Sequence, residues 1–158
     1  MGRKYIGLYN KIITKEGMNM DYKRFGSKYV LRLDKGEEIV ESIKTLCSKE
    51  GIKLASVTGI GATNRAVVGL FETSTKKYHS KELTGDMEIT SLTGNVSQMG
   101  GEVYLHLHVT LADPSYNAYG GHLTSAVISA TGEIIIDTID GEVDREFNEE
   151  VGLNLFKF

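Results

Sequence analysis

The chain has 158 residues, of which 41% are hydrophobic, and 18 Lys and Arg against 21 Asp and Glu give a net charge of -3. A chain of this length forms one domain that removes roughly 70% of its unfolded surface from water, so folding needs no disulfide or metal. The single cysteine excludes an internal disulfide and a cysteine-based zinc site, and no apolar run reaches the ~18 residues of a membrane span.

Residues 1–19 show little periodicity, and regular patterning begins after Met20. We interpret them as a flexible leader, a cloning remnant or a misassigned start, ahead of a single domain over residues 20–158. Residues 1–35 carry nine Lys and Arg against three Asp and Glu, whereas the remainder carries nine against eighteen. Only this N-terminal stretch could therefore supply the basic face that DNA binding requires. Because no secretory signal precedes the domain, we expect a cytoplasmic protein that does not bind membranes.

A strand and a helix are predicted next. The run KYVLRL at 28–33 alternates apolar and polar residues, which is typical of a half-buried strand. Residues 34–51 predict a helix that begins with a capping box of Asp34 and Glu37 and ends at Gly51. Its apolar face consists of Ile39, Ile43, Leu46 and Cys47. We expect Cys47 to be a small core residue and not a nucleophile, because nothing near it in sequence lowers the pKa of a thiol.

Short β-prone runs dominate the remainder, at 52–59, 66–72, 76–83, 87–96, 102–111, 123–131 and 132–139. Several connections between them are too short for helical crossovers, so much of the sheet should be antiparallel. The predicted fold class is α+β, an antiparallel-rich β-sheet with packed helices. The tail at 144–158 fits either a turn of helix or a closing strand.

Two glycines, Gly59 and Gly61, follow a predicted strand and invite comparison with a dinucleotide-binding loop. That interpretation fails, because a third glycine and a following helix are missing. We expect these glycines to lie in a connection between strands and to permit close packing.

Three of the four histidines lie within 17 residues. His106 and His108 are two apart on a predicted strand, so both imidazoles face the same side. After a short loop, Gly120 and Gly121 permit a close backbone approach that can return His122 to the same neighbourhood. Three neutral imidazoles can hold a divalent metal and leave a fourth position for water or a ligand. The alternative is that all three are polar residues of a solvent-facing strand and turn.

Three carboxylates are candidates for orienting a ligating histidine through its free ring N–H. Glu88 and Glu133 interrupt apolar strands, and Asp113 lies in the loop before His122. The alternative for the two glutamates is the solvent side of an edge strand. The fourth histidine, His79, lies in a polar run and is expected to face solvent.

Four motifs occur in a characteristic order: VTGIG at 57–61, EITSLTGNVS at 88–97, LHLHVTLAD at 105–113 and GGHL at 120–123. In this order they resemble the domain conserved in plants and prokaryotes, the PPC domain, over roughly residues 20–158. The resemblance implies a fold similar to that of acetolactate decarboxylase and a homotrimer. It also implies DNA as a partner, since the family is catalogued as DNA-binding.

The histidines are similar to those of metal-containing prokaryotic members and of acetolactate decarboxylase, whose zinc is held by three histidines. The implied ligands are His106, His108 and His122, and the implied cofactor is a divalent metal, zinc above all, although imidazoles also suit copper, nickel and iron. The chain lacks the Arg-Gly-Arg-Pro sequence of an AT-hook. A DNA role therefore rests on the resemblance and not on a residue that reads the minor groove.

Three functions remain open. The first, which we favour, is a stand-alone PPC module that binds DNA or a regulatory protein and carries the metal. The second is a metal-dependent enzyme, a lyase or hydrolase, with Glu88, Glu133 or Asp113 as the acid or base. The third is a sensor whose metal binds a small oxygen-bearing anion. We favour the binding module because no complete catalytic constellation can be assembled, and no catalytic residue is assigned.

Overall fold

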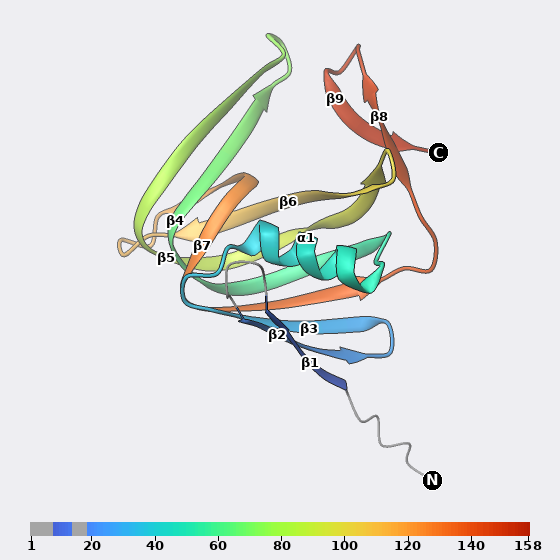
Figure 1. Cartoon of the computed structure of the whole chain (residues 1–158). Coiled ribbons are helices and arrows are strands. Elements are labelled where there is room, and N and C mark those ends of the chain that lie inside the picture. The colour runs from blue at the N-terminus through green and yellow to red at the C-terminus, as the bar shows by residue number, and fades with distance from the viewer. Residues whose placement is uncertain (1–7, 14–18) are drawn as a thin grey trace.

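The computed structural model describes residues 8–13 and 19–158, and Figure 1 shows their arrangement. These residues form nine strands and one helix: β1 (Leu8–Ile13), β2 (Asn19–Phe25), β3 (Lys28–Asp34), α1 (Ile39–Glu50), β4 (Ala55–Glu72), β5 (Lys77–Met99), β6 (Glu102–Ala112), β7 (Ala118–Thr138), β8 (Asp144–Asn148) and β9 (Leu153–Lys157).

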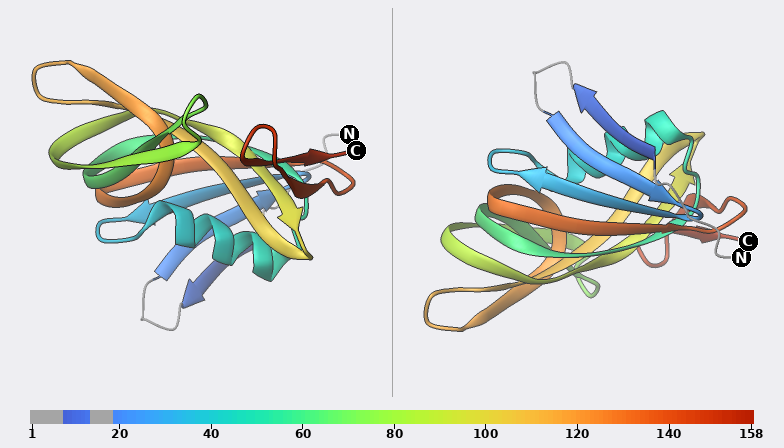
Figure 2. Two further views of the ribbon diagram at one scale, coloured as in Figure 1. Left: turned by 90° about the horizontal axis from the view of Figure 1, so that it is seen from above. Right: turned by 90° about the horizontal axis from the view of Figure 1, so that it is seen from below.

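Seven of these strands form one antiparallel sheet in the order β1-β2-β3-β7-β4-β5-β6. Strand β6 also pairs with β7, so the four strands β4 to β7 close into a ring. Figure 2 shows how strongly these strands curve as the ring closes. The antiparallel character predicted from the short connections is confirmed.

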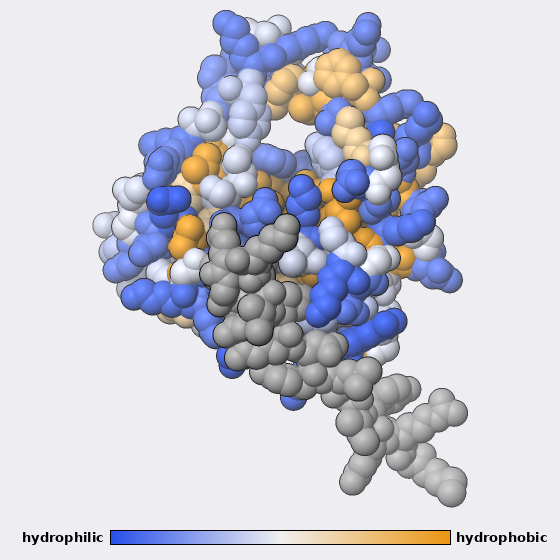
Figure 3. All heavy atoms as spheres, viewed as in Figure 1, coloured by the Kyte–Doolittle hydropathy of each residue, from blue (hydrophilic) through white to orange (hydrophobic). Residues whose placement is uncertain are grey.

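Two hairpins rise at the top of Figure 1. Strand β4 pairs with β7 only as far as Gly69, and beyond it β4 and β5 pair with each other alone. We call residues 70–79 the β4–β5 arm. Strands β8 and β9 form a separate two-stranded sheet, which we call the β8–β9 arm (residues 144–157). Figure 3 shows an opening between the two arms.

Long strands replace the predicted short ones. Pairs of predicted runs are halves of single strands: 52–59 with 66–72 in β4, 76–83 with 87–96 in β5, and 123–131 with 132–139 in β7. Gly59 and Gly61 therefore do not lie in a connection but at a register shift inside β4. Close packing is confirmed, because a Cβ on Gly61 would clash with the backbone of Thr131 on β7.

The start of α1 differs from the predicted capping box. Glu38 is the N-cap, and its carboxylate accepts the backbone N–H of Glu41 at 2.7 Å. The predicted pair is half right, since the Glu37 carboxylate accepts the backbone N–H of Asp34 at 2.6 Å. The second predicted hydrogen bond, from the backbone N–H of Glu37 to the Asp34 carboxylate, does not form. This N–H donates instead to the backbone carbonyl oxygen of Asp34 at 3.1 Å.

The apolar face of α1 is as predicted, with Ile39, Ile43, Leu46 and Cys47 all buried. Gly51 ends the helix in the left-handed conformation, with φ 65. The helix packs against β6 and β7, where its apolar face joins the core formed by the inner side of the sheet. This 12-residue helix is the only one in the described residues, so the predicted packed helices overstate the helical content. The fold is an antiparallel β-sheet covered on one face by one helix.

Both ends of the described chain form strands. The tail predicted as a turn of helix or a closing strand forms the β8–β9 hairpin. Within the predicted leader, Leu8–Ile13 forms β1 and pairs with β2, and residues 1–7 and 14–18 lie outside the described residues. No helix in the described ranges is long and apolar enough to cross a bilayer.

Candidate metal centre

The three clustered histidines come together on two neighbouring strands. His106 and His108 lie on β6 and share a face, because the intervening Leu107 is buried in the core. In the β6–β7 ladder His108 is directly opposite His122, so these two side chains also point to one side. The juxtaposition predicted from the spacing is confirmed.

Two glycines let β7 enter between β6 and β4 at this point. A Cβ on Gly120 would lie 2.7 Å from the carbonyl oxygen of Val109 on β6, and one on Gly121 would lie 2.6 Å from that of Gly69 on β4. Any side chain at these positions would push the strands apart. The glycines before His122 are thus needed for the pairing that brings this imidazole to β6.

The geometry of the cluster suits a metal ion. One ligand nitrogen from each of His106, His108 and His122 lies within 4.8 Å of the others. The Nε2 atoms of His106 and His108 are 3.2 Å apart. Two nitrogens bound to zinc at 2.0–2.1 Å with a tetrahedral angle are about 3.3 Å apart, so this pair already has the spacing of two zinc ligands. The donor set, three imidazoles without a thiolate or carboxylate, fits a site with one open position.

Burial lowers the pKa of two of these imidazoles, His106 and His122. Desolvation, reinforced by the charges of His122, Arg145 and His108, lowers the pKa of His106 to about 4. The pKa of His122 is also lowered, first by burial and then by His108. Histidine binds metals in its neutral form, so proton competition at pH 7 is weak.

The three predicted carboxylates lie elsewhere. Asp113 holds its own loop, because its carboxylate accepts the backbone N–H groups of Ser115 and Asn117 and the hydroxyl of Tyr119. Glu88 and Glu133 are exposed and line one depression beside β4. In the part of the chain that the structure describes, no hydrogen bond joins any of these carboxylates to a histidine. Their role in orienting a ligand stays a prediction.

Two side chains that the sequence did not single out flank the cluster. Tyr78, from the β4–β5 arm, lies edge-on to the His122 ring with centroids 6.2 Å apart. Arg145, from the β8–β9 arm, donates to the side chain of Asn95, which is directly opposite His106 in the β5–β6 ladder. The cluster therefore lies between the bases of the two arms. His79 is exposed, as predicted, and contacts Glu72.

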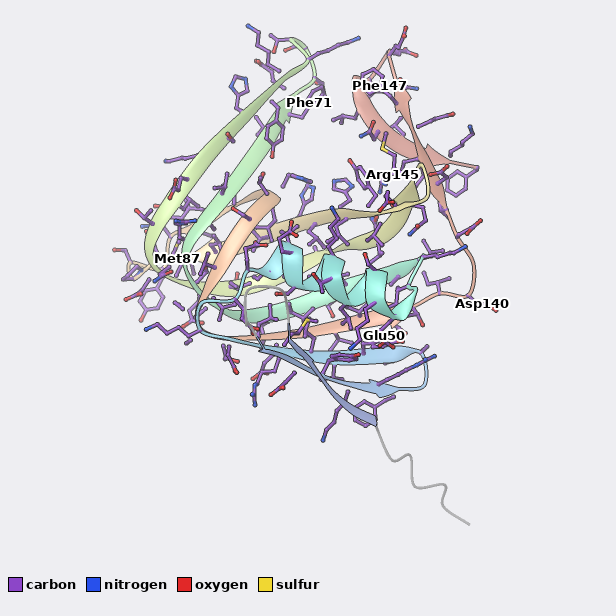
Figure 4. The ribbon with its side chains drawn as sticks, in the orientation of Figure 1. Glu50, Phe71, Met87, Asp140, Arg145 and Phe147 are labelled. Carbon is purple, nitrogen blue, oxygen red and sulfur yellow. The ribbon has the colours of Figure 1, made fainter. Side chains whose placement is uncertain are left out.

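Arg145 had no local signal in the sequence, because the two side chains to which it donates are 48 and 50 residues away on β5. Figure 4 shows it where the β8–β9 arm meets β6. Only the hairpin geometry of the tail, which the sequence left open, brings this side chain to the histidines.

Comparison with known proteins places this fold in a class of antiparallel β-sheet domains conserved in plants and prokaryotes. The family model of the Plants and Prokaryotes Conserved (PCC) domain, abbreviated PPC above, matches residues 20–140. The chain belongs to this family.

Three solved structures resemble the chain over nearly its whole length. A protein of Bacteroides thetaiotaomicron called a "putative DNA binding protein" is 37% identical, with a TM-score of 0.86 and coverage of 88% of this chain and 97% of that one. A "metal-containing protein" of Archaeoglobus fulgidus is 32% identical, with a TM-score of 0.77 and coverage of 96% and 99%. A plant- and prokaryote-conserved (PPC) protein of Pyrococcus horikoshii is also 32% identical, with a TM-score of 0.76 and coverage of 93% and 98%.

More remote likenesses concern the fold or a part of a longer protein. A Staphylococcus aureus protein described as similar to alpha-acetolactate decarboxylase shares the fold at 12% identity and a TM-score of 0.53. The bifunctional protein GlmU of two Synechococcus strains is 28% and 26% identical over 110 and 127 residues. The chain spans only 16% and 19% of the length of these curated relatives.

Proposed function

We propose that this protein is a regulatory module of the PPC family that binds one divalent metal ion, zinc, through His106, His108 and His122. The observation that carries the proposal is the convergence of three imidazole nitrogens within 4.8 Å on two adjacent strands. The Archaeoglobus relative described as metal-containing supports it. Zinc is favoured because three imidazoles and an open fourth position suit its tetrahedral coordination.

Elemental analysis of the full chain, purified without added metal or chelator, tests this proposal. We expect one equivalent of metal per chain in the wild type and a loss of most of it in His106→Ala. His79→Ala is the matched control, since His79 is exposed and outside the cluster, and it should retain the full equivalent. Equal and negligible metal in all three proteins would contradict the proposal.

We also propose DNA as the macromolecular partner, because the Bacteroides relative is called a "putative DNA binding protein". With a net charge of -3 for the chain, binding should be weak and should depend on the Lys and Arg residues within 1–35. A gel-shift titration with duplex DNA at about 50 mM salt should show binding that disappears as salt rises toward 200 mM. Absence of any shift at the lower salt would refute the DNA role.

The enzyme alternative finds no support in the described residues. A hydrolase or lyase at this metal would need an acid or base within hydrogen-bonding reach of the reacting group. No carboxylate belongs to the histidine cluster, and Asp113 is engaged within its own loop. The sensor alternative needs no such group, only the open coordination position.

Three further proposals concern the whole protein. We propose one domain over residues 20–158, a cytoplasmic location because the lone Cys47 suits a reducing compartment, and a homotrimer. Support for assembly comes from the outer face of the sheet, where Val30, Ile60 and Ile135 are 45%, 57% and 44% exposed on neighbouring strands.

A further inference from the structure

Arg145 is a buried cation without a counter-charge. It is 7% exposed and is the only Lys or Arg within residues 20–158 that is buried. No carboxylate forms a salt bridge with its guanidinium in the described part of the chain, and Asp144 accepts only the backbone N–H of Arg145. Burying an ionised group is unfavourable unless an opposite charge or hydrogen bonds compensate it. In the described part of the chain, neutral hydrogen-bond acceptors and aromatic rings surround this guanidinium, and no anion does.

The guanidinium is held in a fixed orientation. Its Nε donates to the Ser97 hydroxyl at 2.8 Å, and its two terminal nitrogens donate to the Asn154 carbonyl oxygen and the Asn95 side chain, each at 2.9 Å. The rings of Tyr104 and Phe156 lie 4.7 and 4.2 Å from its central carbon. A guanidinium has five N–H groups, so two remain after these three bonds. Because neighbouring groups already immobilise the Arg145 side chain, this side chain would lose little further conformational entropy when a ligand accepts from the two remaining N–H groups.

This cation lies beside the histidine cluster. Asn95, which accepts from Arg145, is the cross-strand neighbour of His106, so one side chain separates the guanidinium from the imidazole. A divalent ion held by three neutral histidines keeps its full charge of two. Together with Arg145 the site then carries three positive charges, and no carboxylate joins the cluster to offset them. Such a site selects an anion.

We propose that Arg145 and the three-histidine site form one binding site for a small carboxylate anion, with the metal taking one end of the ligand and the guanidinium of Arg145 the other. This inference rests on the proposed metal site. A carboxylate suits both halves, because its oxygens are ligands for zinc and it matches the planar fork of arginine. The opening between the two arms gives a small molecule access from solvent (Figure 3).

The test uses the full chain loaded with Co²⁺, whose visible absorption reports the ligands of the metal. Acetate and malonate are the probes, and acetamide and malonamide are their neutral counterparts. We expect a carboxylate probe to change the absorption and to raise the thermal midpoint, whereas the amides do neither. If the amides act as strongly as the carboxylates, the inference is overturned.

Variants of the arginine separate its role from that of the metal ligands. In Arg145→Gln the carboxylate affinity should fall at least about tenfold, because a charge-assisted pair is lost. The affinity for Co²⁺ should stay equal or rise, because a repelling charge has gone. Loss of a residue that only anchors the β8–β9 arm would not lower the carboxylate affinity while leaving the Co²⁺ affinity undiminished. Arg65→Gln, at an exposed arginine on β4, is the control and should change neither affinity.

Asn95→Asp provides an independent variant if Arg145→Gln fails to fold. It keeps the size of the side chain and places a carboxylate against the guanidinium, so it should weaken carboxylate binding to a similar extent and tighten metal binding. Unchanged carboxylate affinity in the variants that fold overturns the inference while leaving the metal site intact. A wild type that binds no metal would instead refute the proposed function, and the inference with it.

Discussion

At the scale of single residues, burial makes the thiol of Cys47 unreactive. It lies on the buried face of α1 and is 0% exposed, and burial raises the pKa of its thiol to about 12. The core position expected from the helical spacing is confirmed. A thiol with such a pKa is neutral throughout the physiological range, and the neutral form is not nucleophilic.

We predict that Cys47 does not react with a thiol reagent in the native protein at pH 8 and reacts fully in denaturant. The measurement is the time course of labelling followed by mass spectrometry. Because the folded thiol keeps its proton above its ordinary pKa of 9.0, the unfolded chain releases a proton first, and the free energy of unfolding should fall as the pH rises above about 9. Native labelling as fast as in denaturant would disprove the burial.

Among the individual residues of the site, the histidines were predictable from the sequence and Arg145 was not. His106 and His108 share a face by simple alternation, and the two glycines before His122 indicated its return. Arg145 depends on a hairpin formed by the last 15 residues docking on β5, and no local pattern encodes that contact. Side chains that one strand pair brings together were predictable, whereas one delivered by a separate hairpin was not.

At the scale of elements, Glu38 joins the helix to the sheet. Besides capping α1 through the N–H of Glu41, its carboxylate accepts the backbone N–H of Ala126 on β7 at 2.7 Å. Ala126 is fully buried, so loss of this acceptor would leave a buried N–H without a partner. One side chain thus fixes both where the helix begins and where it lies on the sheet.

We predict that Glu38→Ala lowers the free energy of unfolding by about 2–4 kcal/mol, the cost of a lost N-cap plus that of an unsatisfied buried donor. Urea denaturation followed by circular dichroism measures it. Lys44→Ala, at an exposed position of the same helix, should change stability by less than about 0.5 kcal/mol. Equal effects of the two substitutions would show that the bond to Ala126 contributes nothing.

The elements themselves were predicted unevenly. The helix at Ile39–Glu50 and strand β3 have regular periodicity and appear where the pattern put them. The long strands were divided because glycines and polar clusters resemble turns in sequence. In β4 they instead lie at register shifts, where the strand bends without ending. Whether a glycine ends a strand or bends it depends on the neighbouring strand, which local sequence does not reveal.

At the scale of the whole molecule, the outer face of the sheet exposes apolar side chains on three neighbouring strands. Val30 on β3 and Ile135 on β7 are directly opposite in the ladder, and Ile60 on β4 lies diagonally beside them. Contiguous exposed apolar residues on a sheet are typical of an interface. The proposed trimer would bury them.

We predict that light scattering returns three times the mass of one chain for the wild type and a smaller mass for Ile60→Glu, because a charge in an apolar interface costs its desolvation. Ser48→Glu, on the exposed face of α1, is the control and should keep the wild-type mass. A monomeric wild type at micromolar concentration would remove both the trimer and any role of this face in assembly.

The pairing of β6 with β7 that closes the sheet is also the pairing that carries the histidines. An ion bound by His106, His108 and His122 would therefore act as a removable cross-link around a loop of 17 residues. A permanent cross-link around a loop of about 15 residues is worth about 3 kcal/mol. Amide hydrogens of these two strands would exchange slowly when metal is plentiful and faster when it is withdrawn. The survival of the closed sheet against proteases would then follow the supply of metal in the cell.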